Sequence, residues 1–222
     1  MSFHIHCLDW LLVFASAHPV GLFSSFSHFL KRLKLRNLAL ANMYLLLASM
    51  VGVILSLWLL KPGLLQSFRS ISPAQIAVTV PLAIGCLVAE HFINVVFNFV
   101  GSRKWVFKPN VHSDWSQNIG LQMTLLLMGV VLAEEIIFRG FLLKHLMISF
   151  SLSAFFSVLI SSVFYALHHL HFGWTSVFNK FISGLVYGAS FLFFGTLWAP
   201  ILIHGIQNLL ILGLGKISND SN

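Results

Sequence analysis

Residues 121–143 read LQMTLLLMGVVLAEEIIFRGFLL, an apolar run that holds two adjacent carboxylates, Glu134 and Glu135, and one cation, Arg139. An acidic side chain at the centre of a membrane helix costs about 2.5–3.5 kcal/mol, so such groups are expected to be paired or to face water or a substrate. Arg139 follows Glu135 by four residues, which places both on one helix face. Glu134 lies about 100° further around the helix. We therefore expect Glu135 to be a structural carboxylate paired with Arg139, and Glu134 to be free for chemistry.

The whole chain has the composition of a membrane protein. Its 222 residues are 58% hydrophobic and only 9% charged, with a mean hydropathy of +0.89. The apolar runs are continuous, which favours transmembrane helices. The formal net charge is +7, and a basic stretch at 31–36 stands directly before an apolar run. Basic residues in that position are typical of a cytoplasmic loop, so we expect the lipid bilayer as a partner and no nucleic acid.

The apolar runs predict an all-α, polytopic transmembrane bundle with six spans, or seven if residues 7–30 also cross the membrane. Basic residues concentrate in alternate connections, which the positive-inside rule assigns to the cytoplasm. We expect an integral, multi-pass protein of a prokaryotic cell (inner) membrane. The predicted spans are 38–60, 74–100, 118–143, 149–167, 181–197 and 200–215.

A single domain is expected, because no linker is long enough to divide the chain. Residues 1–37 form an N-terminal apolar segment and a basic loop. Residues 38–117 contain two predicted transmembrane helices and a second basic loop, and residues 118–217 form a helical core that carries the polar motifs.

Two further polar motifs lie in the apolar runs of this core. The first, FYALH, ends at His168, and the second, HGIQN, begins at His204 and ends at Asn208. His204 and Asn208 are four residues apart and so point the same way from one helix. A lone membrane histidine most simply makes an interhelical hydrogen bond, worth about 0.6–2 kcal/mol. Polar groups on three different spans are tolerated only if they converge, so we expect Glu134, His168, His204 and Asn208 to form one site.

Other intramembrane polar residues favour simpler interpretations. His169 and His171 stand near the end of a span, where an interhelical or interfacial hydrogen bond is expected. Glu90 and His91 interrupt the second apolar run. A structural role is favoured for this pair, with a contact to the site left open.

The motifs, in this order, resemble the three signatures of the CAAX prenyl-protease and bacteriocin-processing family (CPBP, also called Abi) of intramembrane proteases. The signatures E-E-x-x-x-R, F-x-x-x-H and H-x-x-x-N correspond to Glu134–Arg139, Phe164–His168 and His204–Asn208. Each pattern alone is weak, whereas all three in order, each inside an apolar helix, are specific. The resemblance covers roughly residues 118–215.

This resemblance implies an intramembrane endopeptidase and a role for each motif residue. Glu134 and His168 are expected to activate a water molecule, and His204 and Asn208 to stabilise the oxyanion. The ion pair within the first motif is expected to order the site. The substrate is expected to be a membrane-anchored or lipidated protein or peptide, such as a lipidated C-terminus, a leader or propeptide, or a sorting tail.

Two mechanisms remain open for such a site. The family has been described both as metalloproteases and as metal-independent glutamic proteases. We favour the glutamate mechanism, which requires no cofactor, because Asn208 is a poor zinc ligand and a good hydrogen-bond donor. If the enzyme depends on a metal, Glu134, His168 and His204 are expected to hold Zn²⁺ with an open position for water.

Other classes of protein fit the sequence less well. The H-E-x-x-H motif of site-2-type metalloproteases is absent, and the rhomboid motif G-x-S-G is broken because Phe191 follows Ser190. Presenilin-type enzymes need two membrane aspartates, but Asp9, Asp114 and Asp220 lie outside the six predicted spans. The alternative from another class is a transporter or partner-binding scaffold that uses the same polar cluster for protons or ions. A transporter would more often show repeated halves and broken helices.

Overall fold

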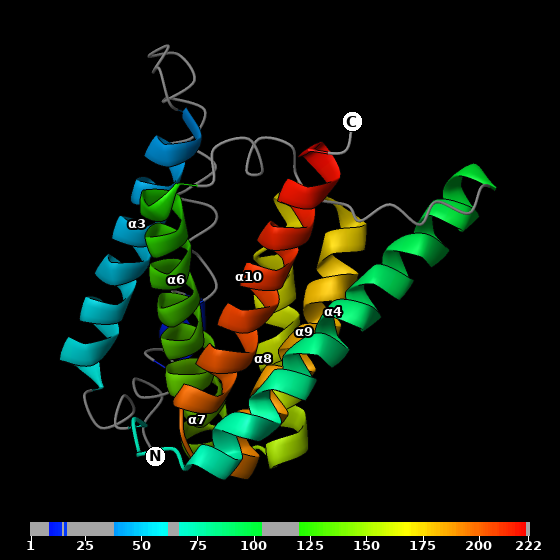
Figure 1. Cartoon of the computed structure of the whole chain (residues 1–222). Coiled ribbons are helices and arrows are strands. Elements are labelled where there is room, and N and C mark those ends of the chain that lie inside the picture. The colour runs from blue at the N-terminus through cyan, green and yellow to red at the C-terminus, as the bar shows by residue number, and fades with distance from the viewer. Residues whose placement is uncertain (1–8, 15, 17–37, 62–66, 104–119, 221–222) are drawn as a thin grey trace.

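The computed structural model describes residues 9–14, 16, 38–61, 67–103 and 120–220, and all statements below concern these residues (Figure 1). Much of the predicted N-terminal segment and of the basic loop at 101–117 lies outside them. Regular secondary structure in the described residues is helical, with no strand among them. The all-α prediction is therefore confirmed.

Three helices of the described chain are long and apolar enough to cross a membrane: α3 (Leu38–Leu60), α4 (Pro73–Ser102) and α9 (Trp174–Phe194). In α3 the candidate span is Leu40–Leu60. Two others, α8 (Ala154–Leu167) and α10 (Trp198–Asp220), also contain apolar stretches, but these are shorter than the three candidate spans. The chain is an integral membrane protein, and a count of six or seven spans stays a prediction.

The segment that carries the two glutamates changes helix type along its length. It runs through α6 (Leu121–Glu135), a π-helix η2 (Ile136–Leu143) and α7 (Lys144–Ser149). A π-helix closes its hydrogen bonds from residue i to i+5, is rare, and often occurs at functional sites. Every side chain from Ile137 to Leu143 is buried. This widened helix is therefore enclosed by its neighbours on all sides.

The predicted fourth span, 149–167, begins too early. The chain leaves the helix at Phe150, and Ser151 has a φ of 53°, in the left-handed region that a continuing α-helix cannot contain. Ser153 then caps α8, because its hydroxyl accepts a hydrogen bond from the backbone N–H of Phe156 at 3.5 Å. This serine-rich turn separates α7 from α8.

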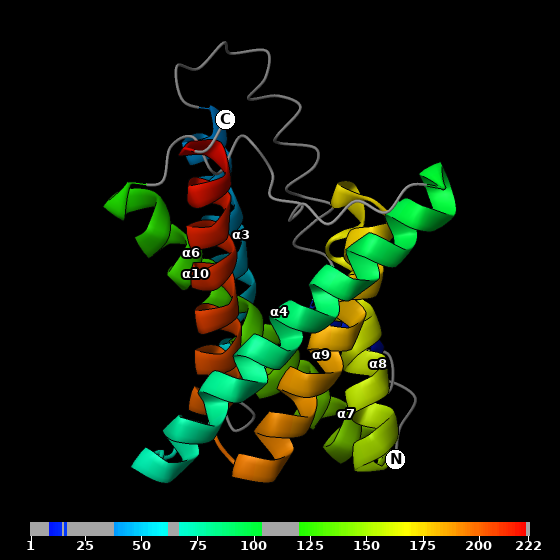
Figure 2. The same ribbon diagram turned by 45° about the vertical axis from the view of Figure 1, so that its right-hand side comes forward.

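The helices around η2 bring the three motifs together. Successive long helices alternate in direction, and α4 lies obliquely across α9 and α10 (Figures 1 and 2). Small residues allow α9 to approach α8 closely: a Cβ on Gly184 would lie 3.1 Å from Tyr165 Cδ1, and one on Gly188 would lie 3.0 Å from Val158 Cγ1. A larger side chain at either glycine would force these two helices apart.

The described part of the N-terminal segment packs against the end of α3 and against α7. Asp9 is buried, with 1% of its surface exposed, and its Oδ1 lies 3.4 Å from Lys61 Nζ. His145 is fully buried and donates from Nε2 to the Asp9 carbonyl at 3.3 Å. These contacts join the start of the chain to the bundle at a place separate from the three motifs.

Candidate active site

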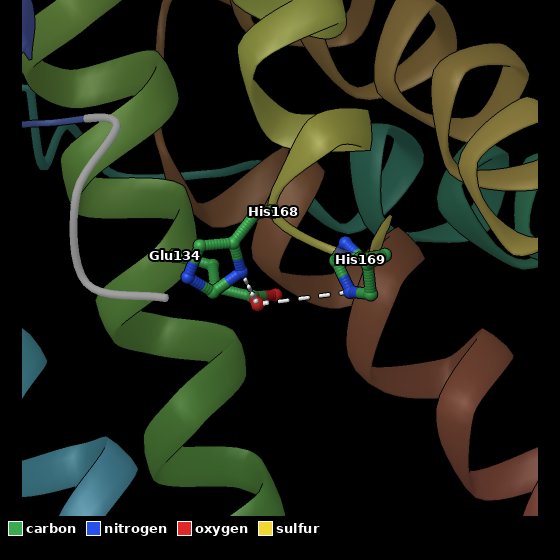
Figure 3. Close-up of side chains that lie close together, drawn as sticks. All are labelled: Glu134, His168 and His169. Carbon is green, nitrogen blue, oxygen red and sulfur yellow. Dashed lines mark ion pairs between the residues drawn. The ribbon is translucent and has the colours of Figure 1, made fainter. Parts of the chain in front are cut away.

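Glu134, in the last turn of α6, faces imidazole nitrogens from two other parts of the chain. Its Oε1 lies 3.6 Å from His168 Nδ1 and 3.9 Å from His169 Nε2. Figure 3 shows both rings turned toward this carboxylate. Its Oε2 lies 3.7 Å from Nε2 of His204, which comes from α10. Glu134, His168 and His204 are each at most 4% exposed. The structure thus brings the carboxylate of the first motif together with the histidines of the second and third.

His168 and His169 both reach Glu134 because α8 ends between Leu167 and this pair. In a continuing helix, adjacent side chains diverge by about 100°. Here His168 is the C-cap, and His169 has φ −99° and ψ 11°, outside helical geometry. His169 was expected to make an interhelical or interfacial hydrogen bond outside the site. The signal that could have included it is its position beside His168 at a helix terminus.

A backbone hydrogen bond fixes the tautomer of His169. Its Nδ1 lies 3.1 Å from the carbonyl oxygen of Tyr165, and a carbonyl can only accept, so Nδ1 carries the proton. In the neutral ring, Nε2 then presents a lone pair toward Glu134. By contrast, His168 Nε2 is buried without a hydrogen-bond partner among the described residues.

Glu135 lies in the other half of the site, and its Oε1 accepts two hydrogen bonds. Arg139 Nη1 donates to it at 3.0 Å, which is the predicted pairing four residues along the chain. His204 Nδ1 donates to the same oxygen at 2.8 Å. With its proton on Nδ1, the neutral His204 ring accepts at Nε2 from the Tyr165 hydroxyl, 3.4 Å away. Glu135 therefore orders both the arginine and the third-motif histidine.

The guanidinium of Arg139 is held between two buried tyrosine rings. Its Cζ lies 4.4 Å from the centroid of Tyr165 and 5.1 Å from that of Tyr187, distances at which a cation is attracted to the ring face. Its Nη2 donates to the carbonyl of Gly184 at 3.2 Å. The Tyr187 ring also stacks on His204, with centroids 4.8 Å apart and planes at 20°. Neither tyrosine was predicted, because in sequence an aromatic residue of an apolar helix cannot be distinguished from a packing residue.

Asn208, the remaining predicted site residue, is half-buried on α10. Its side chain makes no hydrogen bond within the described part of the chain. It stands one turn after His204, on the same side of the helix. Its amide is therefore available to a ligand, and its role stays a prediction.

Glu90 contributes to packing between helices, outside the carboxylate cluster that Glu134 forms with the histidines facing it. Its Oε1 lies 2.9 Å from Lys180 Nζ, which joins α4 to α9. Ser183 donates to the same oxygen at 3.4 Å and accepts from Gln207 at 3.4 Å. Gln207 in turn accepts from the hydroxyl of Tyr187. The structural interpretation of Glu90 fits this geometry, and a chain of polar contacts connects it to the site.

A metal-capable set of ligands exists in the described residues, but it differs from the predicted one. Glu134, His168 and His169 each offer one ligand atom, and these atoms all lie within 4.8 Å of one another. His204, the third ligand expected if the enzyme depends on a metal, has Nδ1 occupied by Glu135 and Nε2 by the Tyr165 hydroxyl. One carboxylate and two imidazoles fit the ligand chemistry of Zn²⁺.

Comparison with known protein families agrees with the site. Residues 116–210 match the family described as Rce1-like, type II CAAX prenyl endopeptidase. This part of the chain is similar to the Rce1-like family. The predicted CPBP resemblance is therefore confirmed, and the matched residues include all three motifs. A search of curated proteins and a search of solved structures gave no match. This similarity supports a CAAX-type intramembrane endopeptidase that acts on a membrane-associated substrate.

Proposed function

We propose that this Rce1-like protein hydrolyses a peptide bond of a lipidated, membrane-associated substrate, with Glu134 as the base that activates water. The observation that carries the proposal is the meeting of one buried carboxylate with His168 and His204 from two other helical elements. The cost of burying such a group in a membrane protein is offset when the group binds water or substrate.

In the proposed reaction, a water molecule binds between Glu134 and His168. Glu134 takes one proton from the water as its oxygen attacks the carbonyl carbon of the scissile peptide. The tetrahedral intermediate then collapses, the C–N bond breaks, and the leaving nitrogen receives the proton from Glu134 or through His168. The products are a carboxylic acid and an amine, and Glu134 returns to its starting state.

The oxyanion of the intermediate requires hydrogen-bond donors, and α10 supplies two candidates. The amide of Asn208 can donate without any prior proton transfer. His204 can donate from Nε2 only when both ring nitrogens carry protons, because its Nδ1 proton is directed at Glu135. A single well-placed donor is worth about 2.7–4 kcal/mol of transition-state stabilisation in other acyl-transfer sites.

An apolar groove beside the site supports a lipidated substrate. An apolar groove of about 300 Å³ lies between α4, α8 and α9, and its lining includes Phe97, Trp174 and Phe178. Leu167, which also lines it, directly precedes His168. We propose that the hydrocarbon chain of the substrate occupies this groove, since each buried CH₂ contributes about 0.8 kcal/mol.

The test is cleavage by the full-length protein reconstituted in lipid vesicles. Substrates are a peptide with a prenylated C-terminal cysteine motif and the same peptide without lipid. We expect cleavage of the prenylated peptide, slower cleavage of the lipid-free peptide, and a loss of about 10²–10⁴-fold in kcat for Glu134→Ala and His168→Ala. His171→Ala, an exposed neighbour outside the cluster, is the matched control. Cleavage by Glu134→Ala at the wild-type rate would show that Glu134 is not the base, and a wild-type protein that cleaves neither peptide would favour the transporter or scaffold alternative.

A further inference from the structure

His169 lies in the carboxylate cluster although none of the three family signatures includes it. Its Nε2 is 3.9 Å from the same Glu134 oxygen that His168 approaches to 3.6 Å (Figure 3). Two histidines adjacent in sequence thus converge on one oxygen. Each ring comes from the end of α8, and the carboxylate comes from α6. This convergence needs a reason other than the water activation assigned to Glu134 and His168.

The tautomer of His169 makes its contact with Glu134 unfavourable without a positive charge between the two groups. The proton on Nδ1 is committed to the Tyr165 carbonyl, so a neutral ring directs the lone pair of Nε2 at the carboxylate. A lone pair and a carboxylate oxygen repel each other unless a proton or a metal ion lies between them. A histidine whose other nitrogen donates to a backbone carbonyl is also the usual arrangement of a metal-binding imidazole.

The distances suit a small ion. Ligand atoms about 2.0–2.2 Å from a tetrahedral ion are about 3.3–3.6 Å from one another. The two carboxylate–imidazole distances, 3.6 and 3.9 Å, are close to this range, and all three ligand atoms lie within 4.8 Å. Small side-chain rotations would bring the three ligand atoms to the distances that such an ion requires. The His169 side chain is 13% exposed, which gives an ion access from the surface of the bundle.

We propose that Glu134, His168 and His169 bind a divalent transition-metal ion, and that the bound ion competes with the water-activating role of Glu134. Only the second half rests on the proposed function. One carboxylate and two imidazoles select ions such as Zn²⁺ or Co²⁺ over Mg²⁺ and Ca²⁺, which prefer oxygen ligands. Binding to a metal ion makes the Glu134 carboxylate a weaker base toward water, so metal occupancy should lower cleavage.

Binding is tested separately from activity, with Co²⁺ as the probe. Full-length protein in detergent is freed of metal with a chelator and titrated with Co²⁺, and the visible absorption of the bound ion reports its coordination. We expect a saturable signal with one ion per chain. His169→Gln should weaken binding by at least about 10–100-fold, the effect of losing even an outer-shell partner of a metal site. His171→Gln should bind as the wild type does.

A gain-of-signal variant covers the case in which His169→Gln does not fold. A cysteine thiolate bound to Co²⁺ gives an intense charge-transfer absorption that imidazole and carboxylate ligands do not give. We expect this absorption in His169→Cys and not in His171→Cys. Its absence from a folded His169→Cys that still binds Co²⁺ would overturn the assignment of His169 as a ligand. Weaker binding in His204→Gln together with unchanged binding in His169→Gln would overturn it too.

The competition is tested by adding Zn²⁺ to the cleavage assay, with each variant compared with its own metal-free rate. We expect Zn²⁺ to inhibit the wild type, and half-inhibition of His169→Gln to require at least about tenfold more Zn²⁺. Activation of the wild type by Zn²⁺ would overturn the competition. If the wild type cleaves no substrate but gives the Co²⁺ signal, the metal site stands and the proposed protease function fails.

Discussion

Glu134 and Glu135 are adjacent, chemically identical and buried, yet their surroundings differ. Glu135 accepts hydrogen bonds from Arg139 and His204 at 3.0 Å or less. Glu134 faces three imidazole nitrogens at 3.6–3.9 Å, longer than a direct hydrogen bond. One carboxylate is therefore fixed by its partners, and the other is committed to none of them. In the proposed mechanism the two differ in role: Glu135 orients His204, and Glu134 acts on water.

Exchanging each glutamate for its isosteric amide should separate the two roles and give the largest effects. Glu135→Gln leaves the guanidinium of Arg139 buried without a carboxylate, which should cost about 3–5 kcal/mol of stability. Glu134→Gln removes no ion pair of that kind, so it should unfold near the wild-type temperature while kcat falls by about 10²–10⁴-fold. Thermal unfolding in detergent and cleavage in vesicles measure the two quantities. Equal losses of stability in the two variants would remove the distinction between them.

Asn208→Ala extends the comparison to α10. The Asn208 side chain makes no hydrogen bond within the described residues, so its removal should change stability little. If its amide donates to the oxyanion, kcat should fall by about 10²–10³-fold with KM nearly unchanged. An unchanged kcat would show that the Asn208 amide does not stabilise the oxyanion, and His204 would be the one residue of the third motif left in the proposed mechanism.

The smallest effects are expected from the two tyrosines that enclose Arg139. Both rings contact the guanidinium, but the Tyr165 hydroxyl faces His204 Nε2 whereas the Tyr187 hydroxyl donates to Gln207. Each Phe variant loses one hydrogen bond, worth about 0.5–1.5 kcal/mol. Tyr165→Phe should also alter the pH profile of kcat, because His204 loses a partner at Nε2. Tyr187→Phe should lower stability and leave that profile in place. Identical pH profiles in the two variants would show that the Tyr165 hydroxyl does not influence His204.

The sequence predicted the parts of the site that depend on local spacing. The pairing of Glu135 with Arg139 needed only helical geometry. The meeting of Glu134 with His168 and His204 followed from the cost of polar groups in a membrane, which forces them together even when the fold is unknown.

What the sequence did not predict depends on where helices stop or change type. The contact of His169 with Glu134 was not predicted, because α8 ends at Leu167 and adjacent side chains diverge by about 100° in a continuing helix. The turn before α8 depends on the backbone of Ser151 and the cap at Ser153, which an apolar run does not disclose. The aromatic enclosure of Arg139 appears only when α8 and α9 are packed together.

The π-helix η2 has a consequence for how this chain tolerates changes in length. Each of its hydrogen-bonded rings encloses one residue more than an α-helical ring, so it accommodates additional backbone directly after the glutamates. Deleting one residue between Ile136 and Leu143 would let the segment relax to an ordinary α-helix. The helices on either side would then keep about the same relative rotation, because the wider turns of η2 rotate less per residue than α-helical turns do. Such a deletion after Arg139 should therefore leave both carboxylates facing their partners, whereas the same deletion in an α-helical stretch would rotate one side by about 100°.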